Sequence, residues 1–286
     1  MASIAESRSW SWRYRDDMAL GELVREKLAR VDPTGLLYRA YERRIIRDLD
    51  PAKLPRHVAV MADGNRRWAR MNAPGQPLVA GYRAGAATLH HFVEWCDELD
   101  IAMATIWVLS TDNFQRSADE ELVPLLDVIA DLVEDLADRW CIRTVGDLGL
   151  LPEAHAERLR SASARSMRHG EGRTQVNIAV SYGGRHEVRD AVRSLLREEA
   201  RAGRTLDEVA DTLELSDIEA HLYTAGQPDP DLVIRTSGEQ RLSGFLIWQS
   251  VHSEFFFCDA LWPDFHKVDF VRALRSYAAR ERRFGK

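Results

Sequence analysis

Short apolar runs rich in valine and isoleucine alternate with longer amphipathic segments along most of this chain, and this alternation constrains the fold more than any other feature. The predicted buried strands are His57–Ala62, Ala102–Leu109, Ile142–Val145, Gln175–Ser181, Leu232–Thr236 and Ser253–Cys258. The predicted helices are Ala80–Leu99, Ala118–Trp140, Pro152–His169, Gly184–Ala202 and Val268–Arg282. Strands that alternate with helices form right-handed βαβ units, so we expect an α/β fold with a mostly parallel central sheet of about six strands flanked by helices.

Two prolines, Pro51 and Pro55, separate this pattern from a different N-terminal part. Before them, a short helical stretch is expected near Leu20–Val31 and a more clearly amphipathic helix at Leu36–Leu49. We therefore expect residues 1–50 to form a partly helical N-terminal extension. Residues 51–286 are expected to form a single catalytic domain, a length within reach of one large α/β domain.

Composition excludes several classes of protein. With 45% hydrophobic and 29% charged residues, the chain has the balance of an ordinary globular protein. Its longest apolar runs, such as Ile101–Leu109, are far shorter than the roughly 20 residues of a transmembrane helix, and no secretory signal is visible. The three cysteines lack CxxC spacing, so we expect the reducing cytoplasm, with at most peripheral membrane contact. The net charge of −6 argues against nucleic-acid binding.

Chemistry is expected at the carboxyl ends of the strands, where parallel sheets bind their ligands. The first strand is followed by the run Asp63-Gly64-Asn65-Arg66-Arg67-Trp68. Free N–H groups at a helix N-terminus bind phosphate, Gly64 permits close approach, and the arginines add charged donors. Asp63 could hold Mg²⁺ against that phosphate. The alternative is that Asp63 only caps the helix, and the residue types leave both interpretations open.

The second and fifth strands also end in polar runs. Ser110-Thr111-Asp112-Asn113-Phe114-Gln115-Arg116 suits a polar pocket with an apolar wall, although Ser117 and Glu120 also fit an ordinary capping box. After the fifth strand, Arg235 and Arg241 could converge on one diphosphate, or each could be a simple ion-pair partner. Arg235 lies in an apolar strand, and a buried arginine needs an anionic partner, which favours the anion site.

Two further candidates are left open or set aside. Glu254 is either a second carboxylate for a metal or an ordinary charge at the rim, and its spacing does not decide between them. His90 and His91 lie within a predicted helix, and we expect no acid or cysteine paired with them at metal-ligand spacing.

The segment His57–Ala69 resembles the first signature of the cis-prenyltransferases, the undecaprenyl diphosphate synthase family. Four later blocks are similar to further signatures of that family in the same order: Ser110–Arg116, Asn177–Arg185, Asp231–Trp248, and Glu254 with Leu261–Phe265. The resemblance runs from about Pro55 to Lys286. It implies a Mg²⁺-dependent condensation of isopentenyl diphosphate with an allylic prenyl diphosphate, which forms a Z double bond.

The resemblance also implies a role for each matching residue. Asp63 would bind or deliver Mg²⁺, and Glu254 matches the second metal carboxylate of the family. The allylic substrate would be held by Gly64, Asn65, Arg66, Arg67 and Trp68. The isopentenyl diphosphate would be clamped by Arg235, Arg241, Leu242 and Ser243. The isopentenyl group would be positioned by Ser110, Thr111, Asp112, Asn113, Phe114 and Arg116. We interpret Asn113 as an orienting group in catalysis, because an amide is a poor base and a diphosphate oxygen is the better proton acceptor.

Other features of the resemblance concern assembly and missing residues. The final Arg283-Phe284-Gly285 is similar to a C-terminal family motif that reaches a diphosphate across a dimer interface, so a homodimer is expected. An arginine and a histidine that assist the allylic diphosphate in many members are absent. Leu78 and Tyr82 are the nearest equivalents, and Arg66 or Arg83 are the candidates to compensate.

The expected product is short. Val108 stands two residues before Ser110, where long-chain members carry a small residue, and bulky Trp107 lies beside it. The segment Arg116–Asp147 also looks short. Both features resemble the actinobacterial short-chain members that convert geranyl diphosphate to Z,E-farnesyl diphosphate. The alternatives are a long-chain decaprenyl or undecaprenyl diphosphate synthase and a catalytically silent partner subunit, against which the presence of Asp63 argues.

Overall fold

The computed structural model describes residues 36–169 and 173–280, and within them the strands form one six-stranded sheet. The spatial order is β3-β4-β2-β1-β5-β6, and every neighbouring pair is parallel. The strands are β1 (His57–Met61), β2 (Met103–Trp107), β3 (Ile142–Val145), β4 (Gln175–Ala179), β5 (Leu232–Arg235) and β6 (Glu254–Phe257). The predicted α/β class and the parallel sheet are confirmed.

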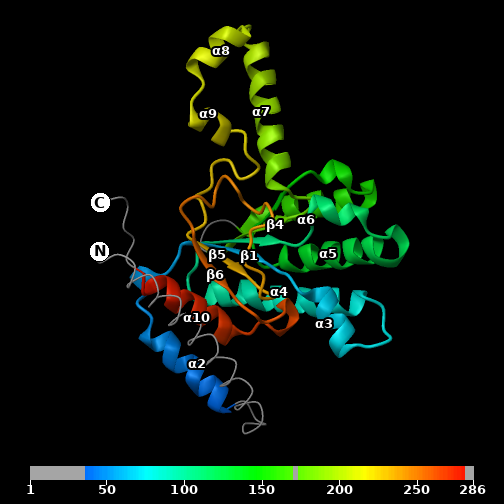
Figure 1. Ribbon diagram of the computed structural model, residues 1–286, viewed down its shortest axis with the longest axis vertical. Helices are drawn as coiled ribbons and strands as arrows, with labels where there is room; N and C mark the ends of the chain where they lie inside the picture. Colours follow the sequence, from blue (N-terminus) through cyan, green and yellow to red (C-terminus); the bar gives the residue numbers. More distant parts are fainter. Residues whose placement is uncertain (1–35, 170–172, 281–286) are drawn as a thin grey trace, which may run out of the picture.

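Helices follow the strands, as the alternating pattern predicts (Figure 1). Four of them, α4 (Val79–Glu98), α5 (Val123–Leu136), α6 (Glu153–Ser166) and α7 (Gly184–Arg201), lie within or beside the predicted segments. A 3-10 turn, Met167–His169, follows α6. Helix α3 (Asn65–Asn72) follows β1, and α10 (Lys267–Ala278) is shorter than predicted. The expected end of that last helix, residues 281–282, lies outside the described part of the chain.

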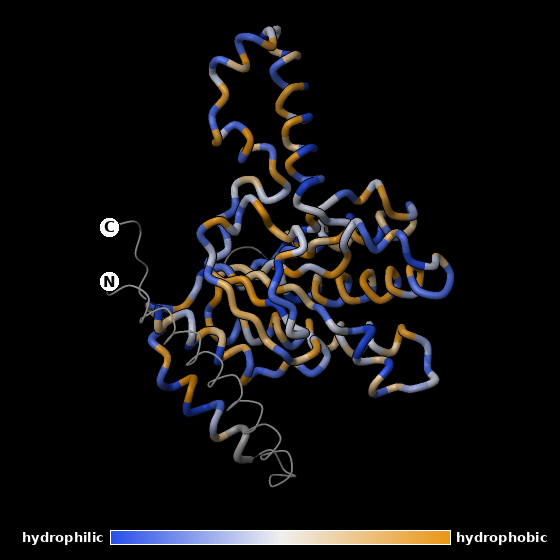
Figure 2. The backbone as a smooth tube through the Cα atoms, in the orientation of Figure 1, coloured by the Kyte–Doolittle hydropathy of each residue, from blue (hydrophilic) through white to orange (hydrophobic). Residues whose placement is uncertain are grey.

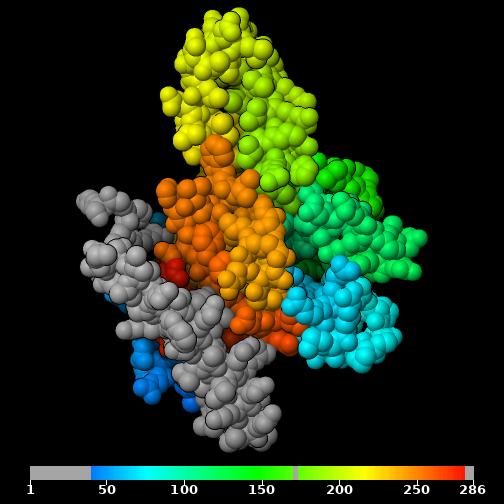
Figure 3. Space-filling view, in the orientation of Figure 1, coloured from blue at the N-terminus to red at the C-terminus, as the bar shows by residue number. Residues whose placement is uncertain are grey.

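An arm of three helices stands apart from the rest of the molecule (Figures 1 and 3). It consists of α7 and two short helices, α8 (Leu206–Thr212) and α9 (Leu215–Glu219). The sequence pattern predicts neither α8 nor α9, because helices this short do not show an apolar repeat.

The two faces of the sheet are covered differently. Val58 and Val60 face a large apolar core shared with α4, α5, α6 and α10. Ala59 and Met61 point to the opposite face, as the period of a strand requires. That second face packs on Tyr182 and on the turn segment 243–252. Figure 2 shows the apolar strands at the centre of the molecule.

The N-terminal helix α2 (Leu36–Asp48) agrees with the predicted Leu36–Leu49. It lies against α10, where Ile45 packs on Val268 and Val271. The predicted helical stretch Leu20–Val31 lies outside the described residues. Among the described helices, none combines the length and the apolar character that crossing a bilayer requires.

The sheet order determines where a ligand would bind. From β1 the chain passes to β2 on one side, and the later strand β5 pairs with β1 on its other side. The carboxyl ends of these three strands are therefore adjacent, which is where open parallel sheets place their sites.

Candidate active site

An open pocket of about 470 Å³ lies at the carboxyl ends of β1, β2 and β5. It has an apolar wall formed by Trp107, Val108, Leu109 and Leu125, and a polar end formed largely by residues that the sequence predicts. Ten predicted site residues line it: Asp63, Gly64, Asn65, Arg66, Arg67, Ser110, Asn113, Arg116, Arg235 and Ser243. A pocket with a charged end and an apolar wall suits a ligand with a phosphate head and a hydrocarbon tail.

Helix α3 presents its amino end to this pocket. Its N-cap is Gly64, with φ of +110°, a backbone conformation that glycine tolerates best. A Cβ atom at this position would lie 2.9 Å from Cδ2 of Leu261, so a side chain would also meet a steric barrier. The simple interpretation of Asp63 as the helix cap is wrong, because Gly64 occupies that position and no side chain caps the helix. The free N–H groups of the first turn remain for an anion.

A buried ion pair joins the ends of β1 and β5. Arg235 is 4% exposed, and its Nη2 donates to Oδ2 of Asp63 at 2.9 Å. Its Nη1 donates to Oγ of Ser243 at 3.0 Å and to the main-chain oxygen of Arg241. The hydroxyl of Thr236 donates to the main-chain oxygen of Asp63 at 2.8 Å. In this structure the anionic partner of the buried arginine is the carboxylate of Asp63, whose side chain is 45% exposed and open to the pocket, and the predicted contact of Arg235 with a diphosphate stays a prediction.

The loop after β2 is held by its own asparagine. Oδ1 of Asn113 accepts the backbone N–H of Ser110 at 3.1 Å. With this oxygen engaged, Asn113 has its amide N–H groups to offer a substrate, which agrees with an orienting role. The alternative of a capping box at Ser117 and Glu120 is wrong, because Ser117 makes no side-chain cap bond and Ala118–Leu122 forms a π-helical turn.

Several predicted residues lie outside the pocket. Nε1 of Trp68 donates to Asp264, and Leu242 packs against the smaller core. Thr111 and Phe114 line a separate cavity of about 350 Å³, and Asp112 is exposed. The six predicted residues that the structure does not place on the pocket, apart from Glu254, are therefore Trp68, Thr111, Asp112, Phe114, Arg241 and Leu242.

The sequence predicts that Arg241 and Arg235 form a clamp of two arginines. The side chain of Arg241 is 65% exposed and forms an ion pair with Glu239, a neighbour on the same loop. Only its main-chain oxygen touches Arg235. The structure therefore brings Arg235 and Ser243 to the pocket, while the Arg241 guanidinium points to a local acid.

Glu254 occupies the amino end of β6, whereas Asp63 follows the carboxyl end of β1. The strand register puts Glu254 level with Leu232 and Val58. A parallel strand rises about 3.3 Å per residue, so Glu254 lies about 10 Å along the strands from the carboxyl end of β1, and Asp63 lies beyond that end. The carboxylate of Glu254 pairs with Arg280. The structure does not bring the two predicted metal carboxylates together, and the metal role of Glu254 stays a prediction.

Several residues of the pocket are not predicted as site residues from the sequence. Arg70 lies one helical turn after Arg66 on α3, a spacing that signals a shared face. Tyr82 comes from α4, at the position where the family histidine is absent. Leu125 comes from the first turn of α5 and extends the apolar wall.

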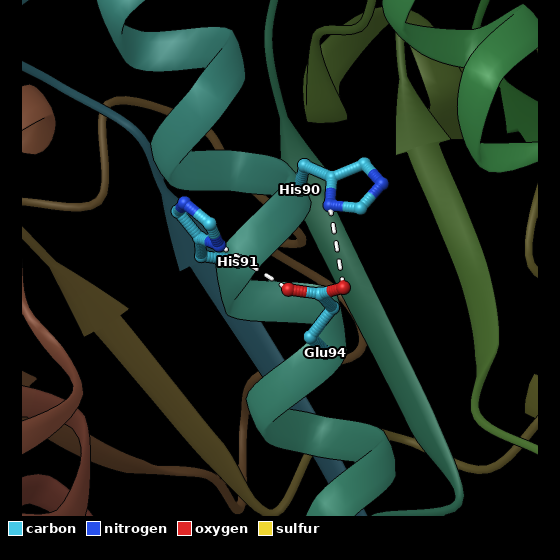
Figure 4. A group of neighbouring side chains, drawn as sticks. All are labelled: His90, His91 and Glu94. Carbon is cyan, nitrogen blue, oxygen red and sulfur yellow. Dashed lines mark hydrogen bonds and ion pairs between the residues drawn. The ribbon is translucent and has the colours of Figure 1, made fainter.

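His90 and His91 do have a paired acid, contrary to the expectation. Glu94 lies one turn further along α4, with Nδ1 of His91 at 3.2 Å and Nδ1 of His90 at 3.8 Å from its carboxylate oxygens (Figure 4). The carboxylate also accepts a bond of 2.7 Å from Nη1 of Arg139. Because an arginine already pairs with this carboxylate, we interpret the group as an ion-pair cluster.

Comparison with known proteins identifies the family. The family model described as "Putative undecaprenyl diphosphate synthase" matches residues 61–285. The chain belongs to the cis-prenyltransferase family. It is 52% identical over 254 residues to the (2Z,6E)-farnesyl diphosphate synthase of Mycolicibacterium smegmatis, a match that covers 87% of this chain and 95% of that protein. It is also 52% identical to the short-chain Z-isoprenyl diphosphate synthase of Mycobacterium bovis over 87% of this chain and 96% of that one.

A solved structure supports the same assignment. The crystal structure of lavandulyl diphosphate synthase from Lavandula x intermedia, in complex with dimethylallyl diphosphate, matches with a TM-score of 0.73 and 33% identity. The match covers 82% of this chain and all of that one. The predicted family and fold are therefore confirmed, and the chain is a prenyltransferase of a family that is generally Mg²⁺-dependent.

Proposed function

We propose that this cis-prenyltransferase condenses isopentenyl diphosphate with geranyl diphosphate to give Z,E-farnesyl diphosphate. The observation that carries the proposal is the pocket at the ends of β1, β2 and β5, which joins a charged end to a short apolar wall. The names of the most similar relatives point to the same substrate class.

The two substrates fit two parts of the charged end. The amino end of α3 with Arg66 and Arg67 suits the allylic diphosphate, and Arg235 with Ser243 suits the isopentenyl diphosphate. In the reaction, the isopentenyl double bond attacks C1 of the allylic substrate, and the bond from C1 to the diphosphate oxygen breaks. A proton then leaves C2 of the isopentenyl unit. Helix N–H groups and guanidinium groups stabilise the negative charge of the departing diphosphate.

The donor set of the pocket fits Mg²⁺. This ion is usually held by one or two carboxylates together with substrate phosphate oxygens, and Asp63 offers a half-exposed carboxylate beside the proposed diphosphate sites. When bound, Mg²⁺ would neutralise charge on the leaving diphosphate. Asp63 is the ligand that the geometry supports, and Arg235 orients its carboxylate through the bond to Oδ2.

The packing behind the pocket favours a short product. Beyond Leu125, the space between α4, α5 and the sheet is filled by side chains that are at most 3% exposed, among them Phe92, Ile106, Ile129 and Val133. A chain of ten or more isoprene units would need this core to open. Val108 lies on the wall itself.

The variant Val108→Ala tests this wall. Removing two methyl groups deepens the pocket, so we expect a longer average product, measured by chromatography of the dephosphorylated prenols. Trp107 is half-buried beside Val108 and stacks on Phe245, which keeps the wall fixed in the variant. Wild-type products of ten or more units would overturn the short-chain proposal and favour the long-chain alternative.

Homodimerisation and location belong to the same proposal. Strand β6 is an edge of the sheet, and edge strands are usually covered. The arm exposes three large apolar side chains within ten residues, at Leu206, Leu213 and Leu215. Both features support a second copy as the cover. The predicted contact of Arg283–Gly285 across the interface lies outside the described residues.

The three cysteines are free thiols, which supports a cytoplasmic location, with at most peripheral membrane contact.

The deciding experiment incubates the pure protein and Mg²⁺ with labelled isopentenyl diphosphate and each of three primers: dimethylallyl, geranyl and farnesyl diphosphate. We expect the highest kcat/KM with geranyl diphosphate and a product of three isoprene units. Asp63→Ala serves as the control and should lose nearly all turnover; because it leaves buried Arg235 without its carboxylate partner, circular dichroism is used to check that it folds. If no primer yields a product, the protein is a silent partner subunit and the proposal is wrong.

A further inference from the structure

Four segments of the chain meet on one carboxylate oxygen at the edge of the pocket. Oε1 of Glu121 accepts the hydroxyl of Tyr82 at 2.6 Å. The same oxygen lies 3.1 Å from Nη1 of Arg116 and 3.2 Å from Nε of Arg66. Nη1 of Arg116 also donates to the Tyr82 hydroxyl at 3.1 Å. Arg66, Tyr82 and Arg116 line the pocket, whereas Glu121 stands behind them.

The backbone places Glu121 there by means of an unusual turn. In the π-helical turn Ala118–Leu122, the main-chain oxygen of Ser117 accepts N–H groups from both Glu121 and Leu122. A π turn holds one more residue than an α turn, and such turns are common at functional sites. Here it directs Glu121 inward, with a side chain only 10% exposed, while Asp119 and Glu120 remain exposed.

The charges of this group leave an excess of positive charge. Two guanidinium groups share one carboxylate, so the cluster has a net charge of about +1 facing the pocket. A buried carboxylate needs such partners, and Glu121 has them. Each arginine presents further N–H groups that Glu121 does not occupy, because a guanidinium has five N–H donors. The cluster is therefore neutralised only in part, and an anion in the pocket would complete it.

Tyr82 acts within this cluster as a link. Its hydroxyl donates to Glu121 and accepts from Arg116. Burial, and next the bond to Glu121, raise the pKa of Tyr82 well above its usual value, so the hydroxyl keeps its proton. Tyr82 thus connects α4 to the loop after β2 and fixes the direction of the Arg116 side chain.

The apolar wall shows which substrate this cluster faces. Leu125 on the pocket wall comes four residues after Glu121, and Tyr82 belongs to α4, the other helix beside that wall. Arg235 and Ser243 come from β5 and the loop after it. Because the allylic substrate carries the longer hydrocarbon tail, its diphosphate belongs beside the part of the wall that Leu125 forms.

We propose that Glu121 is a positioning residue for the allylic diphosphate: it fixes Arg66, Arg116 and Tyr82 in one network, and the two arginines grip the diphosphate. This inference rests on the proposed function, and it moves Arg116 from the isopentenyl group, where the resemblance places it, to the allylic diphosphate. It explains how the pocket works without the arginine and histidine that the sequence lacks near Leu78 and Tyr82. Arg66 compensates, whereas Arg83, the other candidate, does not line the pocket.

The test compares Glu121→Ala, Glu121→Gln and the control Asp119→Ala, which removes the same charge from an exposed position two residues away. The KM for geranyl diphosphate and the KM for isopentenyl diphosphate are measured separately, and the Kd for geranyl diphosphate alone is measured by calorimetry. In Glu121→Ala we expect the geranyl diphosphate KM and Kd to rise about tenfold, the loss of one charged contact, with the isopentenyl KM within twofold of wild type. Glu121→Gln keeps the acceptor oxygen and should recover most of the affinity.

Two outcomes overturn the inference: a geranyl diphosphate KM and Kd within twofold of wild type in Glu121→Ala, or an equal rise in the KM of both substrates. If Glu121→Ala does not fold, as circular dichroism would show, Tyr82→Phe decides by the same criterion. Wild-type protein that makes no product refutes the proposed function instead, so the two failures are distinguishable.

Discussion

Arg235 gives the sharpest test of how the pocket divides its substrates. Arg235→Met keeps a side chain of similar length and removes the guanidinium, which makes three hydrogen bonds to Asp63, Ser243 and the main chain of Arg241. A hydrogen bond to a charged group contributes about 1.5–3 kcal/mol. If the same guanidinium grips isopentenyl diphosphate, the KM for that substrate should rise roughly 10- to 150-fold, at 1.4 kcal/mol for each factor of ten.

The effect on stability should be smaller than the effect on binding. Removing one partner of a buried pair is costly when the other charge stays buried. Here the remaining partner, Asp63, is half exposed and regains water, so we expect a loss of only about 1–2 kcal/mol and a fall of a few degrees in Tm. Arg235→Lys keeps the charge, but an ammonium group cannot bridge Asp63 and Ser243 in the way that a forked guanidinium does. Its KM should be intermediate.

The assay varies isopentenyl diphosphate at saturating geranyl diphosphate, and then the reverse. Arg160→Met is the matched control, because Arg160 is an exposed arginine of α6 that pairs with Glu153. A rise confined to the KM for geranyl diphosphate would show that the two diphosphate sites are assigned the wrong way round. No rise in either KM would show that the guanidinium serves only to hold Asp63.

Three further predictions concern stability and assembly. Gly64→Ala should lower the free energy of unfolding by about 1–3 kcal/mol, because alanine at φ of +110° is strained and its Cβ meets Leu261; thermal melts that match wild type would contradict this. Burial lowers the pKa of His57 from 6.5, so the unfolded chain takes up its proton at higher pH than the folded chain. Stability should therefore be complete above about pH 6.5 and fall as pH drops below it, a dependence that urea unfolding should show to be weaker in His57→Gln. In sedimentation velocity, we expect the wild type to be a dimer and the double variant Leu206→Ser with Leu215→Ser to shift toward monomer. A monomeric wild type would contradict the proposed role of the arm.

Much of the fold follows from the sequence because the signals are local and strong. Buried parallel strands are short runs of valine and isoleucine, and such runs mark β1 to β5 to within a few residues. The same pattern singles out Arg235 as a site residue, because a charged side chain inside an apolar strand needs an anionic partner. The run after β1 is predicted for a similar reason, because its glycine and arginines follow a strand end directly.

The rest of the site depends on local contacts and on backbone geometry that a sequence pattern does not show. Arg241 lies on a loop with Glu239 two residues away, and the nearby acid rather than the pocket takes its guanidinium. Glu121 is directed inward by a π turn, which shifts the helical register by one residue and defeats any reading based on a period of 3.6. Glu254 begins its strand and lies at the amino edge of the sheet, as the predicted strand Ser253–Cys258 already implies, whereas its expected metal role comes only from the resemblance.

The pocket draws its central ion pair and the helical part of its apolar wall from different parts of the chain. Asp63 comes two residues after β1 and Arg235 ends β5, and the hydrogen bonds of the sheet fix both strands. Leu125 belongs to helix α5 instead. A substitution on the helix changes the depth available to a hydrocarbon tail and leaves the strand register untouched. Product size and bond-making chemistry are thus separately adjustable in this architecture, and descendants of one ancestral enzyme could diverge in chain length without rebuilding the machinery that makes each bond.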